Sequence, residues 1–139
     1  MNLRIEDKIK EIEKYLEEMY SIVPSNLREY EKDFKTKAAC ERYVEKLIEA
    51  VVDLGFLMIK EKSLEMPEND LQIFERLSEN KVISKELAKS LQNAKGMRNV
   101  VAHKYGSIDD KIIFNAITEK MKKDVLEFIK NIKQEANRL

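Results

Sequence analysis

The chain has 139 residues, of which 43% are hydrophobic and 37% charged, and its 26 basic residues are balanced by 26 acidic ones. This length suits one domain and leaves no room for two independent cores. A formal net charge of zero argues against a protein that holds nucleic acid mainly by counterion release, so any contact with RNA has to come from a local patch or a specific site.

The composition also narrows the environment and the cofactors. Cys40 is the only cysteine, so the chain forms no internal disulfide and no cysteine-based zinc site, as expected in a reducing cytoplasm. The first residues alternate between charged and apolar side chains, unlike a signal peptide, and no window approaches the ~18 apolar residues of a membrane span. Glycine-rich phosphate loops and metal-ligand clusters are missing. We therefore expect a cytoplasmic protein without a membrane segment, metal or cofactor.

Apolar residues recur at helical spacing along most of the N-terminal half. A first helix is predicted over about residues 3–21, before the turn around Pro24. A second, long helix is predicted over about residues 27–63, with Gly55 at a point where a neighbouring helix packs closely or the helix kinks. Its predicted buried face comprises Phe34, Ala38, Tyr43, Val44, Leu47, Ile48, Val51, Leu54, Phe56 and Met58.

The C-terminal half has the same periodicity. A short helix is predicted around residues 71–77, another begins after the N-cap Ser84, and the last begins after Asp109 and reaches the mid-130s. The apolar stripe of the last helix comprises Ile112, Ile113, Phe114, Ile117, Met121, Val125, Leu126, Phe128, Ile129 and Ile132. Five helices with short connections predict an all-α, up-and-down bundle of four to five helices, with residues 1–139 as a single domain.

The residues best suited to chemistry lie together between positions 98 and 105. His103 is the only histidine, Arg98 is one of six arginines in a chain with 20 lysines, and Asn99 and Tyr105 lie beside them. Arginine offers a forked set of donors to a phosphate, histidine transfers protons near neutral pH, and tyrosine donates a hydrogen bond or stacks on a base. Such groups suit attack by a ribose 2′-hydroxyl on its own 3′-phosphate, a cleavage that needs no metal.

The spacing of this segment raises a geometric problem. Asn99 and His103 share a helix face, whereas Arg98 and His103 diverge by about 140° around the axis. Either the helix ends between Arg98 and His103, or the site combines two copies of the segment. Structural explanations are open as well: His103 as a cap or a packed side chain, Arg98 in a helix-end salt bridge, Asn99 as a C-terminal hydrogen-bonding residue, and Tyr105 covering the end of the bundle.

The segment Arg98-Asn99-Val100-Val101-Ala102-His103-Lys104-Tyr105 resembles the R-x4-H-x-Y motif of the HepT-like toxins, a branch of the HEPN superfamily. The stretch CERYVEKLIEAVVDLGFLMI resembles the second helix of that family. The run from Leu71 to Asp109 resembles the sequence around the family motif, although Asn80 stands where a glycine is common. The resemblance implies a helical HEPN domain that forms a homodimer, in which two facing motif segments form one composite site.

The resemblance also implies a function. Arg98 and His103 would be the catalytic pair, with Asn99 and Tyr105 supporting the motif. The chain would be the toxin of a type II- or VII-like toxin–antitoxin system, a metal-independent endoribonuclease that cuts tRNA or mRNA. Its partner would be an MNT-type nucleotidyltransferase antitoxin that attaches AMP to Tyr105. Two alternatives stay open: a non-catalytic HEPN-like binding subunit that partners a nucleotidyltransferase, and a purely structural helical adaptor.

Overall fold

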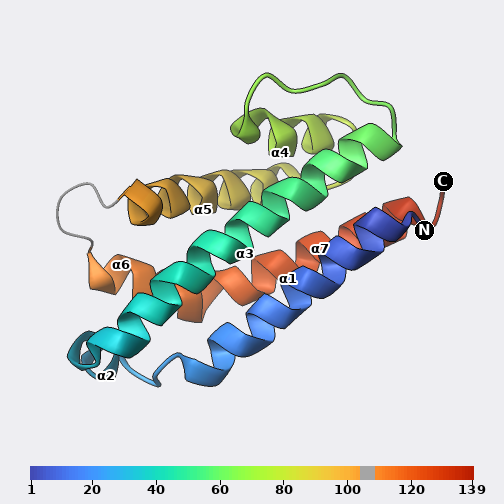
Figure 1. Cartoon of the computed structure of the whole chain (residues 1–139). Coiled ribbons are helices and arrows are strands. Elements are labelled where there is room, and N and C mark those ends of the chain that lie inside the picture. Colours follow the sequence, from blue (N-terminus) through green and yellow to red (C-terminus); the bar gives the residue numbers. More distant parts are fainter. Residues whose placement is uncertain (104–108) are drawn as a thin grey trace.

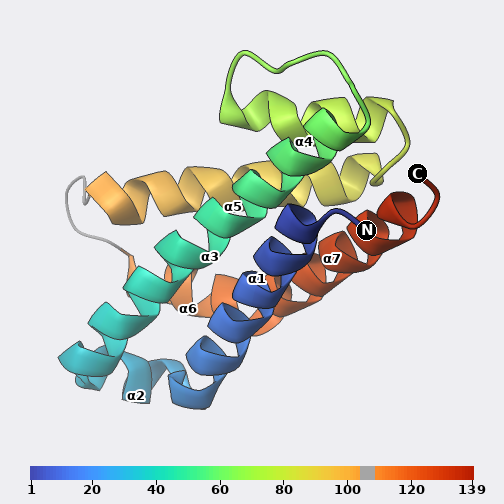
Figure 2. The same ribbon diagram turned by 45° about the vertical axis from the view of Figure 1, so that its right-hand side comes forward.

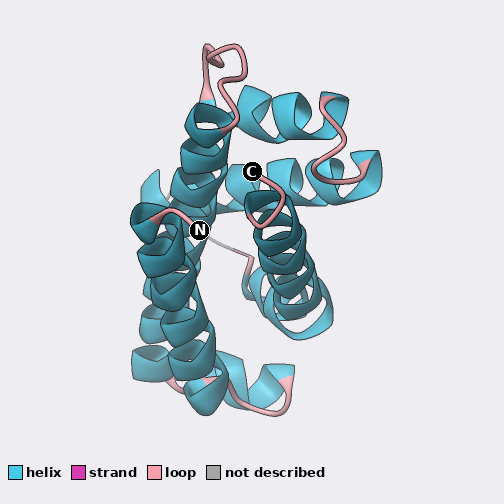
Figure 3. Ribbon diagram, turned by 90° about the vertical axis from the view of Figure 1, so that its right-hand side faces the viewer, coloured by secondary structure: helices cyan, strands magenta, loops and turns pink. Residues whose placement is uncertain are grey.

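A computed structural model describes residues 1–103 and 109–139, with Ala102 and His103 described by their backbone alone. In these ranges all regular structure is helical (Figure 3), which confirms the predicted all-α fold. The elements are α1 (Leu3–Ile22), α2 (Leu27–Lys32), α3 (Phe34–Glu61), α4 (Asp70–Glu79), α5 (Lys85–His103), α6 (Asp110–Asn115), a π-helix (Ala116–Met121) and α7 (Lys122–Ala136). Within the same ranges, no helix combines the length and hydropathy that a membrane crossing requires.

Helix α3 is the central element of the bundle. It runs antiparallel to α1, and it also contacts α2, α4, α5 and α7 (Figure 1). Helices α4 and α5 pack against each other, and α7 returns along the bundle to bring the C-terminus close to the N-terminus (Figure 2). The C-terminal end of α5 lies at the opposite end of the bundle from the two termini.

Short polar side chains begin helices α1 to α6. An N-cap oxygen accepts a hydrogen bond from a backbone N–H of the first turn that has no partner within the helix. Ser84 does so before α5, where its Oγ accepts from Leu87 N at 3.0 Å, and Asp109 does so before α6. Both caps confirm the sequence prediction. The other caps are Asn2, Asn26, Asp33 and Asn69.

The predicted helix over residues 27–63 is wrong at its N-terminal end, where α2 and α3 are separate helices. Asp33 interrupts the helical run and caps α3, because its Oδ1 accepts hydrogen bonds from Lys35 N and Thr36 N. The break lets α2 pack against α6, with the buried Tyr30 ring 5.4 Å from the ring of Phe114. Phe34, expected in the core, is 72% exposed because it occupies the first turn of α3 beyond this contact.

The predicted last helix is also interrupted, by the six-residue π-helix between α6 and α7. A π segment changes the hydrogen-bonding pattern of the backbone, so some groups take other partners. Thr118 Oγ1 donates to the carbonyl oxygen of Phe114 at 2.9 Å, and the hydroxyl of Tyr20 in α1 donates to the carbonyl oxygen of Ile117 at 2.5 Å. Burial raises the pKa of Tyr20 to about 12, so the hydroxyl remains a donor at neutral pH.

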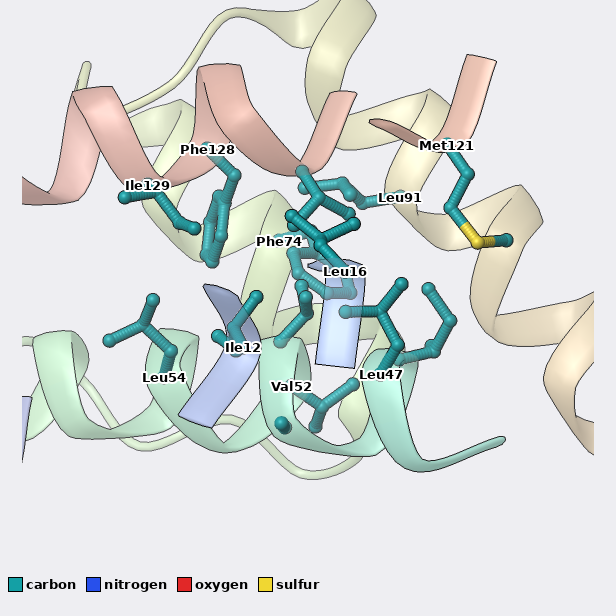
Figure 4. Close-up of a cluster of buried hydrophobic side chains, with 14 of the residues drawn as sticks. Ile12, Leu16, Leu47, Val52, Leu54, Phe74, Leu91, Met121, Phe128 and Ile129 are labelled. Carbon is teal, nitrogen blue, oxygen red and sulfur yellow. The ribbon is translucent and has the colours of Figure 1, made fainter. Parts of the chain in front are cut away.

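The core is formed by side chains from every long helix (Figure 4). Phe74 of α4 and Phe128 of α7 meet edge to face, with ring centroids 5.9 Å apart. Cys40 is fully buried as predicted, and burial raises the pKa of its thiol to about 11. Besides Phe34, four residues of the predicted apolar faces are exposed, because they lie at stripe edges that no neighbouring helix covers: Ala38, Phe56, Ile112 and Leu126.

The left-handed residue after α4 is Lys81 (φ 61°), one position beyond Asn80, where the sequence comparison placed the common glycine. The N–H of Val82 donates to the carbonyl oxygen of Leu77 at 2.9 Å, and that of Lys81 to Ser78 at 3.0 Å. This pair of bonds is a Schellman C-cap, which favours glycine at the left-handed position. In this chain, the position whose backbone conformation favours glycine is therefore 81, where a lysine stands.

Two helical glycines differ in their surroundings, and they make a matched pair for a stability test. A Cβ atom on Gly55 would lie 2.7 Å from Cγ2 of the buried Ile73, whereas one on Gly96 would meet no described residue within 4 Å. Alanine normally stabilises a helix relative to glycine by about 0.5–1 kcal/mol, but overpacking costs about 1–3 kcal/mol. We expect Gly96→Ala to raise the free energy of unfolding in urea and Gly55→Ala to lower it. A higher free energy of unfolding for both variants would show that the Ile73 side chain can move aside to make room for the new methyl group.

Candidate active site

Helix α5 continues without interruption from Lys85 to His103. It begins at the Ser84 cap and is held against the core by Leu87, Leu91 and Val101, which are all buried. The backbone positions of Arg98 and His103 therefore differ by about 140° around one helix axis. Of the two solutions offered by the sequence, an end of the helix between Arg98 and His103 is excluded.

Arg98 lies between α5 and α3. Its side chain is 21% exposed, and Nη2 donates to Glu49 Oε2 of α3 at 3.2 Å. Nη1 makes a longer contact, 3.4 Å, to Asn99 Oδ1. Nε is buried, and the described part of the chain offers it no acceptor. The guanidinium thus makes a salt bridge, as the structural explanation proposed, but with α3 rather than at the end of α5.

Lys95 and Asn99 lie one turn apart on α5 and contact each other. Lys95 Nζ donates to Asn99 Oδ1 at 3.2 Å and pairs with Asp70 Oδ2, the first residue of α4, also at 3.2 Å. Together with the Arg98 contacts, this makes a continuous chain of polar groups across three helices. The order along it is Asp70, Lys95, Asn99, Arg98 and Glu49.

In this row of polar groups, the two cations, Lys95 and Arg98, are each paired with a carboxylate. Together these residues therefore give the motif surface no excess positive charge. Both carboxylates are more than half exposed, however. Glu49 is 60% exposed, so water can hydrate its carboxylate when the pair with Arg98 opens, and a phosphate offers arginine a stronger, bidentate partner. Arg98 can therefore exchange Glu49 for an anionic ligand at small cost.

The other two predicted site residues lie outside what the structure describes. Tyr105 falls between the described ranges, and the side chain of His103 is not described. Elsewhere in residues 1–103 and 109–139, no group of three or more His, Cys, Asp and Glu side chains is placed to hold a metal ion.

An apolar cleft of about 230 Å³ lies beside the part of α5 that immediately precedes the motif. Ala94 and Met97 of α5 form one wall and Ile112 of α6 lies opposite, while Lys120 and Asp124 are among its polar lining residues. Val100, three residues after Met97, is also exposed. The motif helix thus borders an apolar surface larger than a single exposed side chain.

The chain matches a protein-family model described as "Ribonuclease HepT-like" over residues 5–132. It belongs to the HepT-like ribonuclease family. It is 25% identical to a tRNA nuclease HepT of Aphanizomenon flos-aquae over 82% of this chain and 78% of that protein. It is 23% identical to an mRNA nuclease HepT of Shewanella oneidensis over 97% of this chain and all of that protein.

The fold is that of solved HEPN toxins. One is the tri-AMPylated Shewanella oneidensis HEPN toxin in complex with MNT antitoxin, which matches with a TM-score of 0.89 over 96% of this chain and 99% of that one, at 22% identity. Membership in the HepT-like family and the HEPN fold confirm the resemblance inferred from the R-x4-H-x-Y segment.

The sequence interpretation missed three members of the polar chain. Lys95 had a local signal, since residues four apart on a helix are neighbours, so its contact with Asn99 was accessible from spacing. Glu49 and Asp70 had none, because each lies far from the motif in sequence and reaches it only through helix packing.

Proposed function

We propose that this HepT-like protein is a metal-independent endoribonuclease whose active site combines Arg98 and His103 from two copies of the chain. The observation that carries the proposal is the unbroken helix α5. Two groups that diverge by about 140° on one helix cannot close on the same phosphodiester from a single copy, whereas a homodimer with facing motifs supplies both.

The proposed reaction uses the internal nucleophile of RNA. The ribose 2′-oxygen forms a bond to the adjacent phosphorus, the bond from phosphorus to the 5′-oxygen of the next nucleotide breaks, and the leaving oxygen takes a proton. Arg98 would bind a non-bridging oxygen and stabilise the developing charge, while His103 would transfer protons. DNA lacks the 2′-hydroxyl, so RNA is the substrate class, and the nucleases to which the chain is similar act on tRNA or mRNA.

The proposed homodimer is supported by the apolar surface beside the motif. The exposed Ile112 lines the apolar cleft, and the exposed Val100 follows the cleft residue Met97 by three positions on α5; exposed apolar patches mark contacts with other chains. A second copy on this surface would bring two α5 helices together. Sedimentation equilibrium should give about twice the monomer mass of 16.4 kDa.

We further propose that the chain is the toxin of a toxin–antitoxin pair and that an MNT-type nucleotidyltransferase antitoxin silences it by attaching AMP to Tyr105. A solved toxin with the same fold is AMPylated and in complex with MNT antitoxin. A phosphate-bearing group beside Arg98 would compete with the RNA phosphate for the same donors. Intact-mass and peptide analysis after co-expression with such an enzyme and ATP should find AMP on Tyr105. An unmodified Tyr105 peptide would refute this regulation.

The decisive experiment incubates the purified, unmodified protein with tRNA and with a model mRNA in excess EDTA. Cleavage that leaves a 2′,3′-cyclic phosphate or its hydrolysis product would support the proposed mechanism. A need for added divalent metal would overturn the metal-independent mechanism. Absence of cleavage with every RNA tested would favour the non-catalytic binding subunit that partners a nucleotidyltransferase.

A further inference from the structure

Lys95 is the only buried charged residue among those whose exposure the structure describes, at 9% exposed. It stands one helical turn before Asn99 and two turns before His103, so the three residues form one row along α5. Removing an ammonium group from water is costly unless it is paired and hydrogen-bonded. The contacts of Lys95 with Asp70 and Asn99 meet that requirement, and they lead directly to the motif.

The oxygen of the Asn99 amide accepts from two cations. Lys95 Nζ lies 3.2 Å and Arg98 Nη1 3.4 Å from Oδ1. Both groups are donors only, so the amide must present its oxygen to them. Its nitrogen, Nδ2, then points away from both cations with two hydrogens to donate, and within the described residues it has no acceptor. Asn99 itself is exposed, so this donor is available to a ligand.

We propose that Lys95 is a positioning residue that holds the Asn99 amide so that Nδ2 can donate to a phosphate oxygen of the RNA. The inference rests on the ribonuclease function proposed above. Asp70 anchors Lys95 from the first turn of α4, and the shared oxygen keeps Asn99 beside the guanidinium of Arg98. Lys95 acts through Asn99, because its side chain is largely buried and its Nζ already contacts two partners.

The first test measures positioning without using activity. Lys95→Met keeps the length and apolar character of the buried stem but removes the charge and the hydrogen-bond donor. NMR relaxation of the Asn99 side-chain NH2 group in the full-length protein should show a well-ordered amide in the parent and a more mobile one in the variant. An equally ordered amide in both would overturn the proposal.

Lys62→Met is the matched control. Lys62 is another largely buried lysine in an ion pair, with Glu135, and it caps the C-terminal end of α3, thirteen residues beyond Glu49, or about 20 Å along the axis. Its loss should leave both the Asn99 amide and RNA cleavage unchanged. If Lys95→Met fails to fold, Lys95→Gln, which lacks the charge and reaches less far, takes its place.

The second test asks whether positioning matters for cleavage. Lys95→Met should lower kcat about tenfold or more with little change in KM, since misplacement of a contacting group affects mainly the transition state. In an Asn99→Ala background, the same change should alter kcat less than about twofold, because the amide that Lys95 positions is no longer there. An equal loss in both backgrounds, or a purely KM effect, would overturn the proposal.

The two tests separate this inference from the proposed function. If the parent cleaves no RNA, the ribonuclease proposal fails and the catalytic role of Lys95 with it, while the amide measurement still decides whether Lys95 orders Asn99. If the parent cleaves RNA and Lys95→Met does so at the same rate, only the role of Lys95 is rejected.

Discussion

His103→Ala is expected to lower the rate of RNA cleavage by about a hundredfold or more while leaving the helical fold intact. A positioned acid–base side chain contributes about 10²–10⁴-fold to the rate, and the chain has no second histidine to replace it. Truncation of one side chain at the last residue of α5 should cost little stability. The measurement is the cleavage rate of tRNA or mRNA, with circular dichroism and urea unfolding recorded on the same samples.

Arg98→Ala should cause a comparable loss, since it removes the proposed phosphate ligand. Arg42→Ala is the matched control, because Arg42 lies on the surface of α3, 63% exposed, in an ion pair with Glu45 of the same helix. Arg42→Ala should cleave like the parent. If His103→Ala retained the parental rate, the catalytic role of His103 would be wrong, whatever the behaviour of Arg98.

Mixed dimers test the composite site. Arg98→Ala and His103→Ala protomers, unfolded together and refolded, should regain activity that neither variant has alone, because one protomer supplies the arginine and the other the histidine. No recovery in a mixture shown to contain heterodimers would mean that both groups must come from the same copy. That result would contradict the inference of a composite site from the unbroken α5 helix.

Phe128→Ala is expected to give the largest loss of stability, about 3–5 kcal/mol. The Phe128 ring is fully buried, meets Phe74 edge to face, and lies near Gly55 where α7 contacts α3. Its removal would leave a cavity that three helices border and that cannot close without moving one of them. Because small domains have only about 5–15 kcal/mol of total stability, the urea midpoint should fall markedly with a similar m-value.

Leu126→Ala provides the control on the same helix. Leu126 is 44% exposed, so its truncation removes less buried apolar surface and leaves no internal cavity. We expect it to change the free energy of unfolding by less than about 1 kcal/mol. Equal losses for the two variants would show that the Phe128 site collapses freely after truncation, and that the core is less tightly packed than its contacts indicate.

The helices and the motif could be predicted from the sequence because their signals are local. Helical periodicity and caps such as Ser84 and Asp109 act within a few residues, so they identify the helices without knowledge of the fold. The R-x4-H-x-Y segment is contiguous, so its residues indicate the family without any knowledge of which helices pack together. The spacing of Arg98 and His103 left two possibilities, an end of the helix between them or a site built from two copies of the segment. The continuous α5 helix excludes the first.

Long-range packing decided the rest, since nothing within a few residues encodes it. The contact of Tyr30 with Phe114 holds the separate helix α2 against α6, and Tyr20 of α1 supports the π-helix through Ile117. Both partners lie far away in the sequence.

The same limit applies at the site. The sequence by itself determined which residues form the motif and that the motif begins on a helix, because the helical repeat is local. Only the tertiary structure showed that α5 continues through His103, that Glu49 holds Arg98, and that Asp70 holds the buried Lys95. Those ion pairs join α5 to α3 and α4, and they exist only because core packing brings the three helices together.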